Sequence, residues 1–169
     1  ALTPKTMAGK HVVITAGPTQ EAIDPVRYIS NASTGKMGYS LVRACLNRGA
    51  EVTLVSGPTH LSLKAWKEFC PLKVVDVVSS AAMCEATLAA FEHADMAILC
   101  AAVADFTPCT RADKKIKKQP GQEGMSIELT TTTDIAATLG KIKGKRQLVG
   151  FALETHDERA NALRKLESK

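Results

Sequence analysis

The sequence predicts a doubly wound α/β domain, and three observations support this fold class. Short β-branched runs alternate with helical patterns along the chain, which indicates parallel strands joined by crossover helices. The chain has 169 residues, 45% hydrophobic and 23% charged, which suits one globular domain with its own core. Gly17 and Gly57 follow the first two strands, at the end of the sheet where such folds bind ligands. We therefore expect a mostly parallel, Rossmann-like sheet with helices on both faces.

The expected elements begin with a buried strand over residues 11–15, HVVIT. After a long loop, apolar residues recur with helical spacing between Met37 and Cys45, which predicts a helix that ends near Gly49. A second strand follows over residues 51–57, EVTLVSG.

The middle of the chain continues this alternation. Residues 60–71 form an irregular link, in which we expect Trp66 to cap the core. A third strand is expected over residues 73–77, a serine-capped helix over 80–91 and a fourth strand over 95–103.

The regular pattern is interrupted at residues 105–124, which are polar, basic and turn-rich. Because this segment is long for a connection in a compact domain, we expect it to be functional or mobile. Two further strands are expected over residues 126–130 and 147–153, separated by a short helix from Asp134. An amphipathic helix is expected over residues 157–169.

Composition narrows the class of protein. No apolar run approaches the roughly 18 residues of a membrane span, and no signal-peptide pattern is present, so we expect a cytoplasmic protein without a membrane partner. Five cysteines without CxxC or Cys/His spacing indicate reduced thiols rather than a metal site. The net charge of +5 with only 4% aromatic residues favours a basic pocket for a small anion over a nucleic-acid interface.

An open α/β sheet binds ligands beyond the carboxyl ends of its strands. Four strand ends therefore mark the expected site, together with the loop over residues 24–40. These strand ends lead into residues 15–19, 56–58, 100–105 and 151–155.

The loop over residues 24–40 fits neither familiar phosphate-binding pattern. A Walker loop would need a glycine where Ser30 stands and a hydroxyl residue where Met37 stands. The dinucleotide fingerprint GxGxxG does not follow the first strand. What remains is the general anion affinity of a glycine-containing helix start, with Lys36 as a nearby positive charge.

Polar residues in the same loop have two interpretations. Asn31 and Ser33 can supply neutral hydrogen-bond donors to an anionic ligand. Alternatively, Asn31, Ser33 and Thr34 only cap the following helix, because these residue types are favoured at that position.

The stretch ITAGPTQEAIDPVRYISNASTGKMGYSL resembles the opening signature of the phosphopantothenoylcysteine synthetase family, in its bacterial CTP-dependent form. Further matching motifs follow in the family's order and spacing: VTLVSGP, AAVADF, KKIKK, TTDIA and VGFALET. Thr34 replaces a commoner serine, Thr133 stands where proline is frequent, and the family's continuation after Lys169 is absent. Residues 1–10 resemble the linker behind a flavin-dependent decarboxylase half, so we expect a C-terminally incomplete ligase domain over residues 11–169.

The resemblance implies a ligase of coenzyme A biosynthesis that acts in two steps as a homodimer. The carboxylate of 4'-phosphopantothenate attacks the α-phosphate of the substrate CTP, giving an acyl-cytidylate and pyrophosphate. The amine of cysteine then displaces CMP, and Mg²⁺ shares in neutralising the phosphates. Two alternatives stay open: an ATP-using member of the family, and a non-catalytic nucleotide-binding module.

Candidate site residues follow from the same resemblance. Asn31 matches the position that holds the acyl-cytidylate, and Lys115 matches a catalytic cation that also contacts the nucleotide. Arg27 is expected either to contact substrate or to pair with Asp24. The expected substrate-binding residues are Arg27, Ser33, Gly35 and Lys36.

The nucleotide-binding positions carried over from the family lie on strand ends, a helix start and the last helix. They are Leu99, Cys100, Ala101, Asp105, Lys115, Thr133, Asp134, Ile135, Ala136, Phe151, Lys165 and Lys169. Cys100 has no neighbouring histidine in sequence, so we interpret it as a packing thiol rather than a nucleophile.

Overall fold

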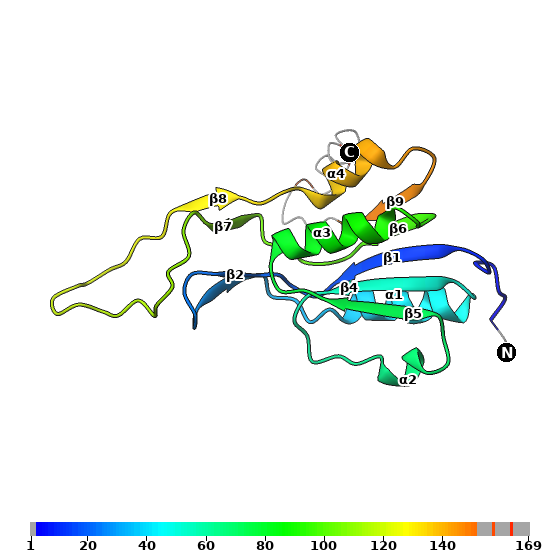
Figure 1. The fold of residues 1–169 in the computed structure, drawn as a ribbon, viewed down its shortest axis with the longest axis horizontal. Helices are drawn as coiled ribbons and strands as arrows, with labels where there is room; N and C mark the ends of the chain where they lie inside the picture. The colour runs from blue at the N-terminus through cyan, green and yellow to red at the C-terminus, as the bar shows by residue number, and fades with distance from the viewer. Residues whose placement is uncertain (1–2, 152–156, 158–162, 164–169) are drawn as a thin grey trace.

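The structure, a computed structural model, describes residues 3–151, 157 and 163 (Figure 1). Its centre is a five-stranded sheet with the order β5-β4-β1-β6-β9, in which every neighbouring pair is parallel. The strands are β1 (His11–Ala16), β4 (Glu51–Ser56), β5 (Leu72–Asp76), β6 (Met96–Leu99) and β9 (Gln147–Gly150). The all-parallel sheet, with helices on both faces, confirms the doubly wound α/β fold expected from the sequence.

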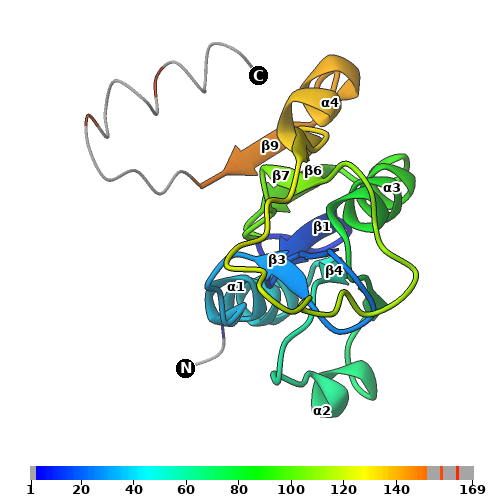
Figure 2. The ribbon, with the colours of Figure 1, turned by 90° about the vertical axis from the view of Figure 1, so that its left-hand side faces the viewer.

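The two faces of the sheet carry separate cores. Val12 and Ile14 of β1 pack in a cluster with helix α1 (Lys36–Asn47), and Val13 packs in a second cluster with α3 (Ser80–Phe91) and α4 (Ile135–Ile142). Figure 2 shows α1 and α3 on opposite sides of β1. The division follows from the strand geometry, because successive side chains point to opposite faces. Trp66 packs against the first cluster, as expected.

The helix starts are stabilised in different ways. Ser79 caps α3 by accepting a bond from the Ala82 amide, which confirms the expected serine cap. Asp134 caps α4 by accepting a bond from the Ala137 amide at 2.9 Å. Helix α1 instead begins after Gly35, whose left-handed φ of 73° suits a glycine.

Short elements depart from the sequence expectation. A hairpin of β2 (Gln20–Ala22) and β3 (Tyr28–Ser30), and the helix α2 (Lys64–Lys67), were not predicted. The strands expected over residues 95–103 and 126–130 are shorter or shifted: the first is β6, and the second is β8 (Leu129–Thr131), which lies outside the central sheet. Elements of three or four residues are too short to carry a clear hydrophobic period.

Strand β8 pairs antiparallel with β7 (Phe106–Pro108), and the chain between them projects away from the sheet (Figure 1).

At the other end of the molecule, Met7 of the expected linker packs against the first core cluster, and its amide donates to the Arg48 carbonyl. No helix within the described residues is long and apolar enough to cross a bilayer.

Two glycines allow close approaches of the backbone at the carboxyl ends of β1 and β4. A Cβ at Gly38 in α1 would lie 2.5 Å from the Cβ of Ala16, at the end of β1. A Cβ at Gly57, just after β4, would lie 1.7 Å from the carbonyl oxygen of Pro18. Neither approach leaves room for a side chain. Gly38 therefore lets the start of α1 lie against the end of β1, and Gly57 lets the chain after β4 lie against the chain after β1.

Candidate functional site

The candidate site lies where the chain leaves β1 and β6 toward opposite faces of the sheet. Helix α1 follows β1 on one face of the sheet, and α4 lies between β6 and β9 on the other face. The neighbouring strands β1 and β6 therefore mark the topological switch point. An open pocket of about 480 Å³ lies here, lined by residues 32–38 and Cys100. The loop over residues 24–40 and the end of β6 are therefore brought together as expected.

The start of α1 supplies backbone donors to this pocket. The hydroxyls of Ser33 and Thr34 accept bonds from the Gly35 and Lys36 amides at 3.3 and 3.4 Å. Within the described part of the chain, the amides of Met37 and Gly38 have no hydrogen-bond acceptor. Free amides and the helix dipole favour an anion at this position, and the exposed Lys36 adds a positive charge.

Asn31 connects the opening loop to the end of β6. Its Nδ2 donates to the Val103 carbonyl at 2.9 Å and to the Ala102 carbonyl at 3.4 Å. The capping alternative is therefore wrong for Asn31, although Ser33 and Thr34 do bond to amides at the helix start. The bond to Ala102 is long and therefore weak, so Asn31 could donate a hydrogen bond to a ligand in its place at little cost in free energy.

Buried hydroxyls that the sequence interpretation missed hold the segment Cys100–Ala104. The Oγ1 of Thr15 accepts from the first two amides of this segment, each at 3.2 Å. The Oγ1 of Thr19 accepts from the Ala104 amide at 2.9 Å, and Thr132 donates its hydroxyl to the Ala104 carbonyl at 2.7 Å. Threonine at the end of a buried strand was the available signal, but the sequence does not reveal its partner.

The expected nucleotide-binding residues of β6 lie on this segment. Leu99 and Ala101 pack against the second core cluster, so only their backbone groups face the rim. Burial raises the pKa of the Cys100 thiol, which keeps it protonated near neutral pH and agrees with a packing role. Asp105 is exposed, and its carbonyl accepts the Thr132 amide at 2.9 Å, which brings it beside the start of α4.

Some of the remaining nucleotide-binding candidates lie at the same carboxyl end of the sheet. Thr133, Asp134, Ile135 and Ala136 form the start of α4, directly after Thr132. Phe151 follows the carboxyl end of β9 with half of its surface exposed. Lys165 and Lys169 lie outside the described residues.

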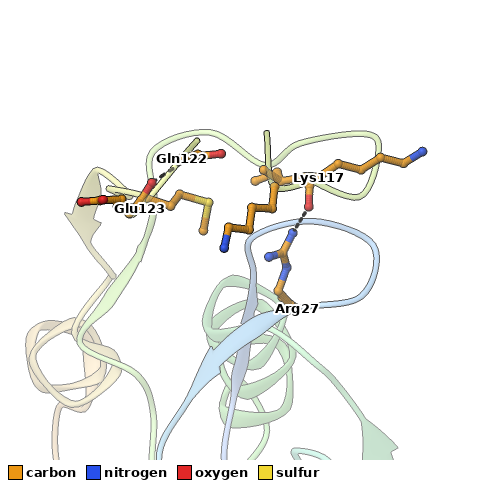
Figure 3. A pocket seen from close by; sticks show the side chains of 8 residues that line it. Arg27, Lys117, Gln122 and Glu123 are labelled. Atoms are coloured by element: carbon orange, nitrogen blue, oxygen red, sulfur yellow. Dashed lines mark hydrogen bonds between the residues drawn. The ribbon is translucent and has the colours of Figure 1, made fainter. Parts of the chain in front are cut away.

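Arg27 pairs with Asp24, which was one of its two expected roles. Its Nε donates to Asp24 Oδ2 at 3.0 Å, and its Nη2 also contacts that oxygen. The Arg27 guanidinium, assisted by backbone amides, holds the pKa of the buried Asp24 carboxyl far below its ordinary value. Arg27 also lines a second open pocket of about 260 Å³, beneath Lys117 and Glu123 (Figure 3).

The long segment over residues 105–124 is tied to the domain at several points. Its first part forms β7, the Ala112 amide donates to the Ile23 carbonyl at 2.9 Å, and the Ile116 amide donates to Asp24. The first part of the segment, up to Ile116, is therefore bound to the rest of the domain. Lys115 is exposed and lines neither of the two pockets.

Comparison with known proteins shows the family of the chain. Residues 7–169 match the family model described as the DNA/pantothenate metabolism flavoprotein C-terminal domain. The chain belongs to this family. The resemblance drawn from the sequence motifs is thereby confirmed at the level of the family.

Relatives of this pantothenate metabolism domain include much longer proteins. The chain is 51% identical over 168 residues to the coenzyme A biosynthesis bifunctional protein CoaBC of Bacillus subtilis (strain 168), covering 99% of this chain and 40% of that protein. It is 54% identical over 169 residues to a cysteine/cysteine sulfinic acid decarboxylase of an unknown prokaryotic organism, covering 99% of this chain and 45% of that protein. The chain thus spans less than half the length of these relatives.

Two solved structures share the fold of this chain. The crystal structure of the C-terminal domain of CoaBC aligns with a TM-score of 0.81 and 41% identity, over 97% of this chain and 74% of that chain. A Cab2 H337A mutant in complex with phosphopantothenate-cysteine aligns with a TM-score of 0.74 and 18% identity, over 94% of this chain and 69% of that chain. At that identity the second likeness shows the fold alone.

The donor groups at the rim fit a metal ion held mainly by substrate phosphates. Within the described residues, no group of three or more His, Cys, Asp or Glu side chains could form a protein cage for a metal. Asp105 is an exposed carboxylate beside the switch point. Mg²⁺ is commonly held by one or two carboxylates together with phosphate oxygens and water, which this arrangement allows.

Proposed function

We propose that this domain is the phosphopantothenate–cysteine ligase half of a coenzyme A biosynthesis protein, and that it uses CTP through an acyl-cytidylate. The observation that carries the proposal is the start of α1, which offers backbone amides to an anion at the switch point. The chain is also 51% identical to CoaBC. Met37 and Gly38 present free amides there, within the described residues, where a phosphate would bind. The decarboxylase name of another relative describes a whole protein, of which this chain matches 45%.

In the first step, the carboxylate of 4'-phosphopantothenate attacks the α-phosphate of CTP and pyrophosphate leaves. Both reactants are anions, so fixed donors and cations must offset their repulsion. The amides at the start of α1, Lys36 and Lys115 are the groups proposed for this role, with Arg27 and Ser33 on the substrate side. Mg²⁺ would neutralise phosphate charge, and Asp105 is its proposed protein ligand.

In the second step, the amine of cysteine attacks the acyl carbonyl, a tetrahedral oxyanion forms and CMP leaves. A neutral hydrogen-bond donor suits this oxyanion. Unlike a carboxylate, a neutral group does not stabilise the protonated form of the amine, which cannot attack. Asn31 is proposed as that donor, through the amide hydrogen that makes only the 3.4 Å contact with Ala102.

The nucleotide is proposed to lie along the carboxyl edge of the sheet. Backbone groups of residues 99–101 and 133–136 would contact it, Phe151 would pack on the base, and Lys165 and Lys169 would add positive charge. Small or half-buried residues at the end of β6 leave room for a planar base. A cytoplasmic homodimer is proposed as the working form, by family resemblance.

Pyrophosphate release by the full-length protein tests this proposal. With 4'-phosphopantothenate and CTP, release is expected before cysteine is added, and amide product is expected only afterwards. Release with ATP and not with CTP would transfer the proposal to the ATP-using branch. Nucleotide binding without release from either nucleotide would indicate a non-catalytic module.

Lys115→Gln is expected to slow pyrophosphate release about tenfold to a hundredfold, because a hydrogen bond to a charged group contributes roughly 1.5 to 3 kcal/mol. Single-turnover release with CTP and 4'-phosphopantothenate measures this effect. Lys114→Gln removes a charge from the adjacent exposed position and serves as the control. Equal rates for the two variants would return Lys115 to the role of a solvated surface residue.

A further inference from the structure

We infer that the buried carboxylate of Asp24 is a positioning residue that holds Ile116, and through it Lys115, beside the opening loop. This inference rests on the proposed function only where it concerns the ligase reaction. Its structural part concerns two segments far apart in the sequence, since Asp24 and Ile116 are separated by 92 positions.

The Asp24 carboxylate is fully engaged within the protein. Its Oδ1 accepts the amides of Val26 and Arg27, both at 2.9 Å, which closes the loop around it. Its Oδ2 accepts the Arg27 guanidinium and the Ile116 amide, the latter at 3.1 Å. The side chain has no exposed surface, so it cannot itself serve as a substrate contact.

Arg27 completes the attachment of Ile116. Its Nη2 donates to the Ile116 carbonyl at 2.6 Å, the bond drawn in Figure 3. The ion pair therefore binds both the N–H and the C=O of one residue in the long segment. The peptide groups on both sides of the Ile116 Cα are thereby held, which leaves the backbone of Ile116 little freedom to rotate. Lys115 precedes Ile116 directly and shares the first of these two peptide groups.

The charges around this point explain why a buried anion is needed. Lys114, Lys115, Lys117 and Lys118 flank Ile116, and Arg27 lies against it. Clustered cations repel one another, so without a fixed negative charge this part of the segment would move away from Arg27. Asp24 is buried whereas 41% of the Arg27 side chain is exposed, so solvent screens their attraction in part, and the backbone donors to Asp24 contribute to holding its charge.

The nearby bond between Ala112 and Ile23 joins the same two segments through backbone groups alone. A side-chain substitution at position 24 leaves that bond in place. The consequence of losing the carboxylate should therefore be local, with Ile116 and its neighbouring lysines released while the segment stays attached at Ala112.

The structural test is limited trypsin cleavage of the full-length protein with Asp24→Asn. Cleavage after Lys115 is expected to rise about tenfold or more, as bonds to a charged group are lost and local opening becomes easier. Cleavage after Lys67 in the exposed helix α2 is the internal reference. Asp95→Asn is the matched control. Asp95 also accepts a backbone amide, from His11, and pairs with Lys10, but it lies at the amino ends of β1 and β6, away from the candidate site.

A second variant covers the case in which Asp24→Asn unfolds. Arg27→Lys keeps a cation beside Asp24 but cannot reproduce the two-sided guanidinium contact with Asp24 and the Ile116 carbonyl. It is expected to raise cleavage after Lys115 several-fold while the far-ultraviolet circular dichroism stays unchanged. Unchanged cleavage after Lys115 in a folded variant of either kind would overturn the inference.

The functional test is a double-mutant cycle with Lys115→Gln, read by pyrophosphate release. If Asp24 acts through Lys115, Asp24→Asn slows release about tenfold in the wild-type background and less than about twofold in the Lys115→Gln background. Equal factors in both backgrounds would show that Asp24 does not act through Lys115. If the unmodified protein releases no pyrophosphate, the proposed function fails, and cleavage after Lys115 alone decides whether Asp24 holds Ile116.

Discussion

Gly57→Ala is expected to destabilise the domain by more than about 3 kcal/mol, at the upper end of the effect of an added methyl group in a packed region. The new Cβ would lie 1.7 Å from the Pro18 carbonyl oxygen and 2.8 Å from its carbonyl carbon. Both atoms belong to the backbone, so no side-chain rotation relieves the overlap. The chain after β1 or β4 must move, and this movement would also disturb Thr19, which holds the end of β6.

Urea unfolding monitored by circular dichroism measures this effect. Gly124→Ala is the matched control, since an added Cβ there meets no atom within 4 Å and the residue has no left-handed backbone. That variant is expected to stay within about 0.5 kcal/mol of the unmodified protein. Similar unfolding midpoints for the two variants would show that the ends of β1 and β4 are not packed as closely as the structure places them.

Asn31→Asp is expected to slow amide formation about a hundredfold to a thousandfold, the range observed when a donor to an oxyanion is removed. A carboxylate at this position accepts hydrogen bonds and repels the developing negative charge. Pyrophosphate release with CTP and 4'-phosphopantothenate is expected to fall much less, because the substitution removes no cation from the phosphates. The two half-reactions are separated by adding cysteine only after the acyl-cytidylate has accumulated.

The contacts of Asn31 provide a competing explanation with a different result. Its amide also holds the Val103 carbonyl at 2.9 Å, and a carboxylate would repel that oxygen. If this structural role dominates, the end of β6 shifts and both half-reactions fall together. Asn47→Asp makes the same chemical change at an exposed position at the far end of α1 and is expected to leave both steps unaffected.

The longer elements could be predicted from the sequence. The expected helix over residues 80–91 coincides with α3, and the strands over residues 51–57 and 73–77 agree with β4 and β5 within two residues at each end. Five or more residues of regular hydrophobic spacing contain enough repeats to identify the element. The order of the strands in the sheet, β5-β4-β1-β6-β9, was not predicted and came from the structure.

The candidate site could be predicted less completely. The sequence indicated the start of α1 and the end of β6 as ligand-binding segments, and the structure places both at one pocket. It marked residues 15–19 as a strand end at the site, but it did not indicate that the hydroxyls of Thr15 and Thr19 hold the segment after β6. A buried threonine looks the same in sequence whether its hydroxyl bonds within its own helix, as Thr87 does, or to a distant strand.

The sequence by itself determined the fold class, the family and the segments that form the site, because these depend on local hydrophobic period and on ordered motifs. Only the tertiary structure showed that Arg27 pairs with Asp24, and only it showed Asp24 bound to Ile116, 92 positions away. The physical reason is that a buried charge is stable only where the folded chain brings enough donors to it. Those donors come from segments whose meeting depends on the whole path of the chain, so no local pattern specifies them.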